Sequence, residues 1–279
     1  MGFCRKIINK MIEYLINDLI ISLRSKWARI YLIGAFALIL LANIAVICFR
    51  FIYGSNEGTF SYNVFEYASW CFLIPYYSTI LLAHIAVGRE YIYPRKDGNV
   101  LEIPVLAGRP TKGKVVLKPV KLYLEKLLLT ILLAFVFFVA AVAFLYVTTQ
   151  LFHINEGIIP WMILRLFLEK AALAIPLWFA GISFAVMFFF IFEKKWKAYV
   201  GFAIVTVLIP QTIRILSLDR FKSEAARMIR RYTITQSFGF VPYPSYPDRS
   251  VPLIVAIGLT YGFIALIVGL VIYCKKADR

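Results

Sequence analysis

The residues best suited to chemistry lie in a polar segment between two long apolar runs, at residues 87–126. Its basic side chains are Arg89, Arg95, Lys96, Arg109, Lys112, Lys114, Lys118, Lys121 and Lys126. Only four acids oppose them, namely Glu90, Asp97, Glu102 and Glu125. Side chains of this kind form ion pairs with a partner or with lipid headgroups. A long basic connection between apolar runs is typical of the cytoplasmic side of a membrane protein.

Part of this segment matches a phosphate-binding loop. Gly108, Gly113 and Lys114 follow the G-x-x-x-x-G-K pattern, but Val115 stands where the Mg²⁺-holding Ser or Thr is needed. A nucleotide-binding domain also needs a parallel sheet, for which one short connection leaves no room. We therefore interpret the glycines, with Pro110, as a turn beside the membrane, and we predict no nucleotide or metal site in this chain.

The cysteines and histidines do not form a catalytic or metal-binding pattern. Cys4, Cys48, Cys71 and Cys274 lack the regular spacing of a metal site or a disulfide framework. Cys48 and Cys71 are expected near the outer ends of adjacent helices, so a bridge between them is conceivable, but free packing thiols are favoured. His84 is expected to be a packing residue. Acidic residues fall almost entirely outside the apolar runs, which disfavours a proton pump, because pumps need buried acids as relays.

Composition indicates the class of protein. Hydrophobic residues make up 61% of the chain, against about 45–50% in an ordinary soluble domain. The net charge of +16 could suggest nucleic acid, but no aromatic-interleaved basic domain is present. Topogenic lysines and arginines and anionic headgroups explain the charge better. We therefore predict the lipid bilayer, and no nucleic acid, as a partner.

The apolar runs predict an all-α membrane protein with six transmembrane helices. Each run is long enough to cross a bilayer, which takes about 20 residues, and must be helical because hydrocarbon offers the backbone no other partner. Pro75 and Pro210 are expected to bend two of these helices, Asn43 to hydrogen-bond to a neighbouring helix, and Gly258 with Gly262 to admit a close helix partner. The predicted spans are residues 30–49, 67–87, 122–147, 171–192, 198–216 and 251–273.

The remaining segments complete the predicted topology. Residues 1–29 form an interfacial amphipathic helix, and residues 30–279 form the six-span domain. Within that domain, residues 88–121 are a cytoplasmic segment, residues 148–170 an interfacial or partly re-entrant piece, and residues 218–250 an extracellular segment. Lysines and arginines are enriched in the segments placed inside, with both termini cytoplasmic.

One alternative topology stays open. A re-entrant fifth apolar run would put the 218–250 segment inside and the C-terminus outside. Lys275 and Lys276 at the end of the last run argue against it.

The residues after the second span resemble a known family. Glu90, Gly98, Leu101, Glu102 and Pro110, followed by Lys118 or Lys121, resemble the corresponding run in the permease subunit of an ABC transporter of the second exporter type. In that family a cytoplasmic coupling helix lies between spans two and three. The stretch from Gly98 to Pro110 is longer here than in the family, and Pro104 lies where the coupling helix is expected.

The resemblance implies a function and partners. It implies an ATP-driven exporter at the plasma membrane, in which a separate ABC ATPase subunit holds ATP and Mg²⁺ and a second permease copy or paralogue completes the path. The chain itself is then not an enzyme. The residues implied to contact the ATPase are Glu90, Asp97, Gly98, Leu101, Glu102, Glu193, Lys194 and Lys195.

Other functions are compatible with the same helices. A non-transporting membrane scaffold or immunity-type subunit would have the same spans. A membrane-embedded lipid-modifying enzyme would need a cluster of Asp, Glu or His at one membrane face. A channel or secondary carrier would often show internal repeats. The uncharged, aromatic-rich spans suit an amphipathic cargo, and the basic 218–250 segment suits an anionic one.

Overall fold

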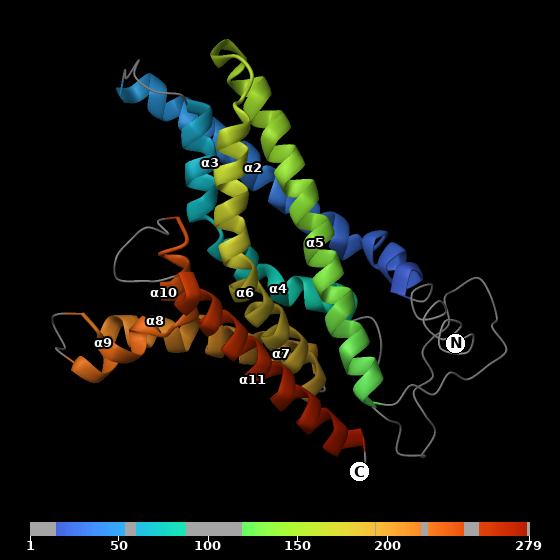
Figure 1. The fold of residues 1–279 in the computed structure, drawn as a ribbon. Coiled ribbons are helices and arrows are strands. Elements are labelled where there is room, and N and C mark those ends of the chain that lie inside the picture. The colour runs from blue at the N-terminus through green and yellow to red at the C-terminus, as the bar shows by residue number, and fades with distance from the viewer. Residues whose placement is uncertain are drawn as a thin grey trace.

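The structure, a computed structural model, describes residues 15–53, 60–87, 119–192, 194–218, 223–242 and 251–277. Within these ranges the chain is helical and contains no strand (Figure 1). After a helix at residues 15–23, the elements in chain order are α2 (Lys26–Tyr53), α3 (Phe60–Trp70), α4 (Leu73–Ala86), α5 (Pro119–Phe152), a 3₁₀ turn (Ile154–Glu156), α6 (Trp161–Ile191), α7 (Lys195–Ala203), a π-helical segment (Ile204–Leu208), α8 (Ile209–Leu216), α9 (Glu224–Arg231), α10 (Ile234–Phe238) and α11 (Val251–Ala277).

The described helices are those of a multi-pass membrane protein. Five are long and apolar enough to cross a bilayer, and a sixth is obtained if α3 and α4, bent by 58° at their junction, form one broken span. The predicted class, an all-α membrane protein, is therefore confirmed. The six-span topology, with its coupling helix, stays a prediction.

Helix α6 is the centre of the molecule, packed against α3, α4, α5, α7 and α11. Of its most apolar stretch 72% is buried, against 11% for α2 and 11% for the helix Lys195–Leu216. Small residues allow this burial, because Ala174, Ala180 and Gly181 bring neighbouring helices close to its backbone. Helix α2 and the helix 195–216 instead expose apolar side chains to lipid or to a partner.

One very close helix contact joins α6 to α11. A Cβ atom on Gly258 would lie 2.5 Å from the backbone carbon of Pro176, and one on Gly262 would lie 2.5 Å from the ring of Phe179. Only glycine permits this approach. The predicted small-residue pair therefore does admit a close partner, and the partner is α6 of the same chain.

The second apolar run is broken rather than kinked. Helix α3 ends at Trp70 and α4 begins at Leu73, so the bend lies just before Pro75. Pro75 stands in the first turn of α4, where its missing N–H would have no helical partner in any case. The Trp178 side chain donates a 2.9 Å hydrogen bond from Nε1 to the Phe72 carbonyl, so α6 satisfies a backbone group at the break.

Helices α5 and α6 are longer than the predicted spans. They contain 34 and 31 residues, or about 50 and 46 Å at 1.5 Å per residue, more than the hydrocarbon thickness of about 30 Å. The connection between them is only His153–Pro160, not the longer interfacial piece predicted. Gln150 closes it: its Nε2 donates to the Gly157 carbonyl at 2.7 Å, and its Oε1 accepts from the Ile159 N–H at 3.0 Å.

The fifth candidate span diverges from the bundle. In Figure 1 it starts beside the end of α6 and runs out to one side as α7 and α8. The π-helical segment precedes Pro210 and accommodates the missing N–H and the bulk of its ring, since a π-bulge re-spaces the backbone hydrogen bonds. No residue of α8 is buried.

The interhelical hydrogen bond of α2 differs from the prediction. Asn43 is buried, but its Nδ2 donates to the Ile39 carbonyl of the same helix at 3.1 Å. The bond between helices comes instead from Tyr31, whose Oη lies 2.9 Å from Ser78 Oγ of α4.

The α6–α11 contact yields a test with a matched control. Gly258→Ala should lower the free energy of unfolding by about 1–3 kcal/mol, because the added methyl must push α11 away from the Pro176 backbone. Gly34→Ala, in α2 with open space around its Cβ position, should be neutral or slightly stabilising. Thermal unfolding in detergent measures both. Equal midpoints for the two variants would contradict the packing.

Candidate functional site

Most residues implied to contact an ATPase lie outside the described ranges, namely Glu90, Asp97, Gly98, Leu101, Glu102 and Glu193. Lys194 and Lys195 are described. They are exposed at the start of α7, where Lys194 is the residue before the helix. Of the implied contact residues, the structure therefore describes only Lys194 and Lys195. It also describes the two helix ends that flank the 88–118 segment.

Those two helix ends lie at one end of the bundle together with Lys194. His84, near the end of α4, packs in a ring cluster with Trp27 of α2, Phe189 of α6 and Tyr199 of α7, at centroid distances of 5.3, 5.9 and 5.9 Å. His84 is thus a packing residue, as predicted. The cluster joins the start of α2 and the end of α4 to the α6–α7 turn.

Two more ring contacts add α5 and α11 to the same end. Phe190 of α6 lies 4.8 Å from Tyr123 of α5 and 4.7 Å from Tyr273 of α11, measured between ring centroids. The Lys276 ammonium donates a hydrogen bond to the Ile191 carbonyl. We call the end of the bundle that holds Asp18, Val87, Pro119, Lys194 and Lys276 the terminal end; it is at the lower right in Figure 1.

A buried ion pair fixes the first helix to the terminal end. Lys126 Nζ lies 2.9 Å from Asp18 Oδ2, with the Lys126 side chain 1% exposed and that of Asp18 17% exposed. A buried ammonium needs such a partner, because its desolvation costs several kcal/mol. Helix 15–23 is therefore attached to α5. This pair was not predicted, although a lysine at the start of a long apolar run is a signal for a buried partner.

A second ion pair lies toward the opposite end. Lys170 Nζ of α6 lies 2.8 Å from Glu66 Oε2 of α3, and both side chains are largely buried. This pair neutralises two charges inside candidate spans. It also ties α3 to α6, as the Trp178–Phe72 bond does at the break.

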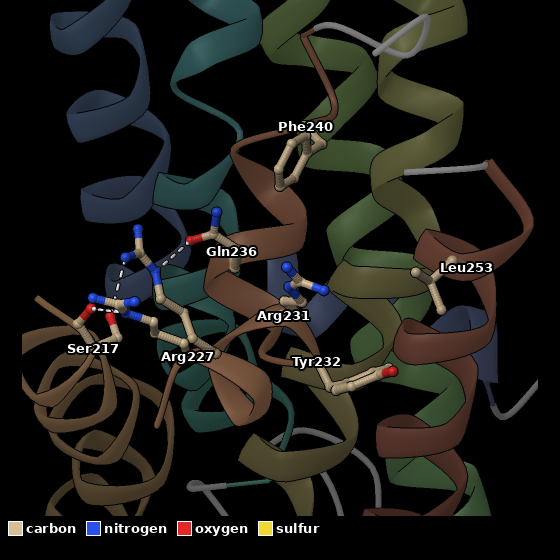
Figure 2. Close-up of a pocket in the computed structure, with 8 residues that line it drawn as sticks. Ser217, Arg227, Arg231, Tyr232, Gln236, Phe240 and Leu253 are labelled. Carbon is tan, nitrogen blue, oxygen red and sulfur yellow. Dashed lines mark hydrogen bonds between the residues drawn. The ribbon is translucent and has the colours of Figure 1, made fainter. Parts of the chain in front are cut away.

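A hollow of about 580 Å³ lies between α8, α9, α10 and α11. We call it the arginine hollow; its lining residues are Ser217, Arg227, Arg230, Arg231, Tyr232, Gln236, Phe240 and Leu253. Figure 2 shows Ser217 and Arg227 at one side and Leu253 at the other, with Arg231 and Gln236 between them. Among the described residues that line the hollow there is no Asp or Glu.

The three arginines share one face of α9, since residues three and four apart are neighbours on a helix. Like charges at this spacing destabilise a helix by about 0.2–0.5 kcal/mol per pair. Arg230 and Arg231 gain some of this back from the helix dipole, because they lie in the last turn. The sequence predicted a basic segment over residues 218–250 but did not single out these arginines as a site.

Within the described residues, no group of three or more His, Cys, Asp and Glu side chains could hold a metal ion. Cys48 and Cys71 are free and exposed. Comparisons with protein-family models, with curated proteins and with solved structures found no match to this chain.

The Glu66–Lys170 pair can be tested by charge exchange. Glu66→Lys should lower stability by about 1–3 kcal/mol, between the values for surface and buried pairs, because two ammonium groups then face each other. Glu66→Lys with Lys170→Glu should recover most of the loss. Thermal unfolding of the wild type, both single variants and the double variant gives the coupling. A double variant no more stable than the single ones would show that the two side chains do not interact.

Proposed function

We propose that this chain is the transmembrane permease subunit of an ATP-driven ABC exporter, coupled to a separate ATPase. The observation that carries the proposal is the convergence at the terminal end. The polar 88–118 segment leaves α4 and returns to α5 there, and the Lys194–Lys195 turn lies at the same end. One soluble partner can therefore reach both segments from one side of the membrane.

The chain forms the substrate path across the membrane, and the partner hydrolyses ATP. The ATPase binds ATP and Mg²⁺. A groove on its surface binds the stretch around residues 97–106. The 193–197 turn makes the second contact. When ATP brings two ATPases together, they move the two attached segments. A ligand at one site thereby shifts a two-state element elsewhere, which is coupling in the thermodynamic sense.

The contacts of the terminal end give this movement a route into the membrane. A push on the 88–118 segment acts on the end of α4 and the start of α5, and both pack on α6 through the His84 and Phe190 ring contacts. The junction between α3 and α4 is already bent by 58°. It is the natural hinge, because hinges lie at the ends of elements, where a few residues absorb the change in backbone angles.

The proposed assembly contains two permeases in the plasma membrane, and each of them has six spans. Both termini and the 88–121 segment are cytoplasmic, in keeping with the excess of lysine and arginine there. The 218–250 segment is then extracellular. A second copy or a paralogue covers exposed apolar helix faces and completes the substrate path between the two chains.

The partner is the first test. The full chain, purified in mild detergent from its own cells at native expression, should retain a nucleotide-binding protein at one-to-one ratio. Quantitative mass spectrometry of the purified complex measures that ratio. Recovery of the chain without an ATPase would favour a scaffold or a carrier instead.

The coupling contact is the second test. Glu102→Lys should lower transport by about tenfold or more, within the usual range of coupling energies, while ATP hydrolysis continues and the thermal midpoint is unchanged. The reason is that a reversed charge repels the basic partner surface expected to face Glu102. Glu169→Lys, an exposed acid in α6 away from the terminal end, is the matched control and should transport normally. Full coupled turnover in Glu102→Lys would refute the contact.

A further inference from the structure

The hairpin of α5 and α6 exposes a cluster of large apolar side chains where its two helices join. We call residues 151–162 the hairpin tip, which is at the top of Figure 1. Its apolar residues are each between 42% and 69% exposed, namely Leu151, Phe152, Ile154, Trp161 and Met162. Ile158, which is 84% exposed, stands in the connection between the helices. Exposed apolar clusters of this kind mark a surface that contacts lipid or another protein.

Charged side chains mark how far the hydrocarbon can reach along this hairpin. Glu169 of α6 pairs with Arg165, and the two side chains are 55% and 68% exposed. An exposed carboxylate inside hydrocarbon is costly, so the hydrocarbon ends on the Lys170 side of Glu169. Residues 170–191 of α6 are about 33 Å long at 1.5 Å per residue, and the hydrocarbon is about 30 Å thick. The span is therefore complete without the hairpin tip.

The α6 side of the hairpin tip lies beyond the lipid headgroups as well. Trp161 stands eight residues before Glu169 in the same helix, which corresponds to about 12 Å. The headgroup layer on one side of a bilayer is only about 5–8 Å thick, and a helix tilt of about 20° changes the height little. Trp161 and Met162 are therefore in water, where lipid does not cover them.

The α5 side of the hairpin tip also lies beyond the hydrocarbon. Phe138 of α5 and Trp178 of α6 lie at one level, with their ring centroids 5.4 Å apart. Leu151 comes 13 residues after Phe138, whereas Glu169 comes only nine residues before Trp178. Because the two helices of a hairpin run in opposite directions, Leu151 lies about 6 Å farther from the membrane centre than Glu169. Acyl chains therefore do not cover Leu151 either.

An exposed row of α5 connects the hairpin tip to the membrane. Phe135, Val139, Val147 and Leu151 are exposed, and so is Ala143 between them. These residues are four apart, so they form one ridge on the helix surface. Ridges of this kind from two helices interdigitate in the commonest class of helix packing. A partner that covers the hairpin tip can therefore also pack along this row.

The area and the height of this surface favour a second copy of the chain as the partner. At about 150–200 Å² per large side chain, the hairpin tip exposes about 450–600 Å², and the α5 row brings the total to about 800 Å². A stable interface needs about 800 Å² on each partner. A two-fold axis along the membrane normal puts two identical tips at the same height, so the same surface of both copies meets.

We propose that the hairpin tip and the exposed α5 row form the contact between two copies of this chain. The contact is lateral and uses the flanks of the hairpin, so Ile158 in the connection stays open to solvent. This inference rests on the proposed function for the presence of a second copy. It deepens that function, because it assigns the surface through which the copies meet, and it does not depend on the ATPase.

The test measures the dissociation constant of the dimer by sedimentation of the purified full chain in mild detergent. Met162→Glu places a carboxylate in the contact from each copy and should raise this constant about 100-fold, at tenfold per copy. A carboxylate in the first turn of α6 favours the helix, so the variant should keep the wild-type thermal midpoint. Met228→Glu in α9 is the matched control, because Met228 is 66% exposed and Met162 is 68% exposed. Its dimer should dissociate like that of the wild type.

Cross-linking tests the position of the contact without adding a charge. The native cysteines are replaced by serine, and single cysteines are introduced by Met162→Cys or Met228→Cys. A short bismaleimide added to native membranes should give a covalent dimer of the Met162→Cys chain and none of the Met228→Cys chain. Equal yields for the two variants would contradict a contact at the hairpin tip.

The contact and the proposed function can fail separately. A folded Met162→Glu chain that dimerises like the wild type would overturn the contact. A wild-type chain that stays monomeric at every concentration would also overturn it, and that result is expected if headgroups or an unrelated protein cover the hairpin tip. Neither result changes the recovery of a nucleotide-binding protein at one-to-one ratio, which is measured independently and decides the proposed function.

Discussion

The close packing of α6 against α11 is the contact on which the rest of the structure depends. Gly258 and Gly262 let α11 approach the backbone of α6 around Pro176 and the ring of Phe179. Between lipid-facing helices there is little hydrophobic driving force, so close packing of this kind supplies the association energy. With α6 enclosed in this way, α3, α4, α5 and α7 all pack on a helix whose position is fixed.

Each break in the helices is compensated, as a low-dielectric environment requires. Trp178 donates to the Phe72 carbonyl where α3 and α4 separate, and the π-helical segment absorbs Pro210. Charged side chains in the helices are likewise neutralised, by the Asp18–Lys126 and Glu66–Lys170 ion pairs. Of these contacts, the Asp18–Lys126 pair lies at the terminal end. The exposed helix 195–216 is held to the bundle mainly at its start.

The sequence predicted the helices better than it predicted their ends and contacts. Long apolar runs identify membrane helices because every residue in them carries the same signal. Arg165, Glu169 and Lys170 instead suggested a connection, although α6 begins at Trp161. Arg165 pairs with Glu169 one turn away, and Lys170 pairs with Glu66 at a separation of 104 residues. A partner that distant in the chain leaves no local pattern, and the same holds for Asp18 with Lys126, 108 residues apart.

The candidate sites also differ in how far the sequence predicts them. The order of residues from Glu90 to Lys121 suggested a coupling segment, and His84 and the Gly258–Gly262 pair were assigned packing roles that the structure shows. The arginine hollow was not predicted, because it forms only when α8, α9, α10 and α11 meet. The charge on one helix face can be read from a sequence. The side chains of other helices that lie opposite that face cannot.

We propose above all that the 88–118 segment faces the cytoplasm and is held there by an ATPase. The most direct measurement is labelling of Leu101→Cys, in a chain whose native cysteines are replaced by serine, with a membrane-impermeant maleimide. Ile158→Cys, in the exposed α5–α6 connection, serves as the outward-facing reference. We expect Ile158→Cys to be labelled in intact cells. Leu101→Cys should be labelled only after the membrane is opened and the ATPase is removed. Labelling of Leu101→Cys in intact cells would contradict it.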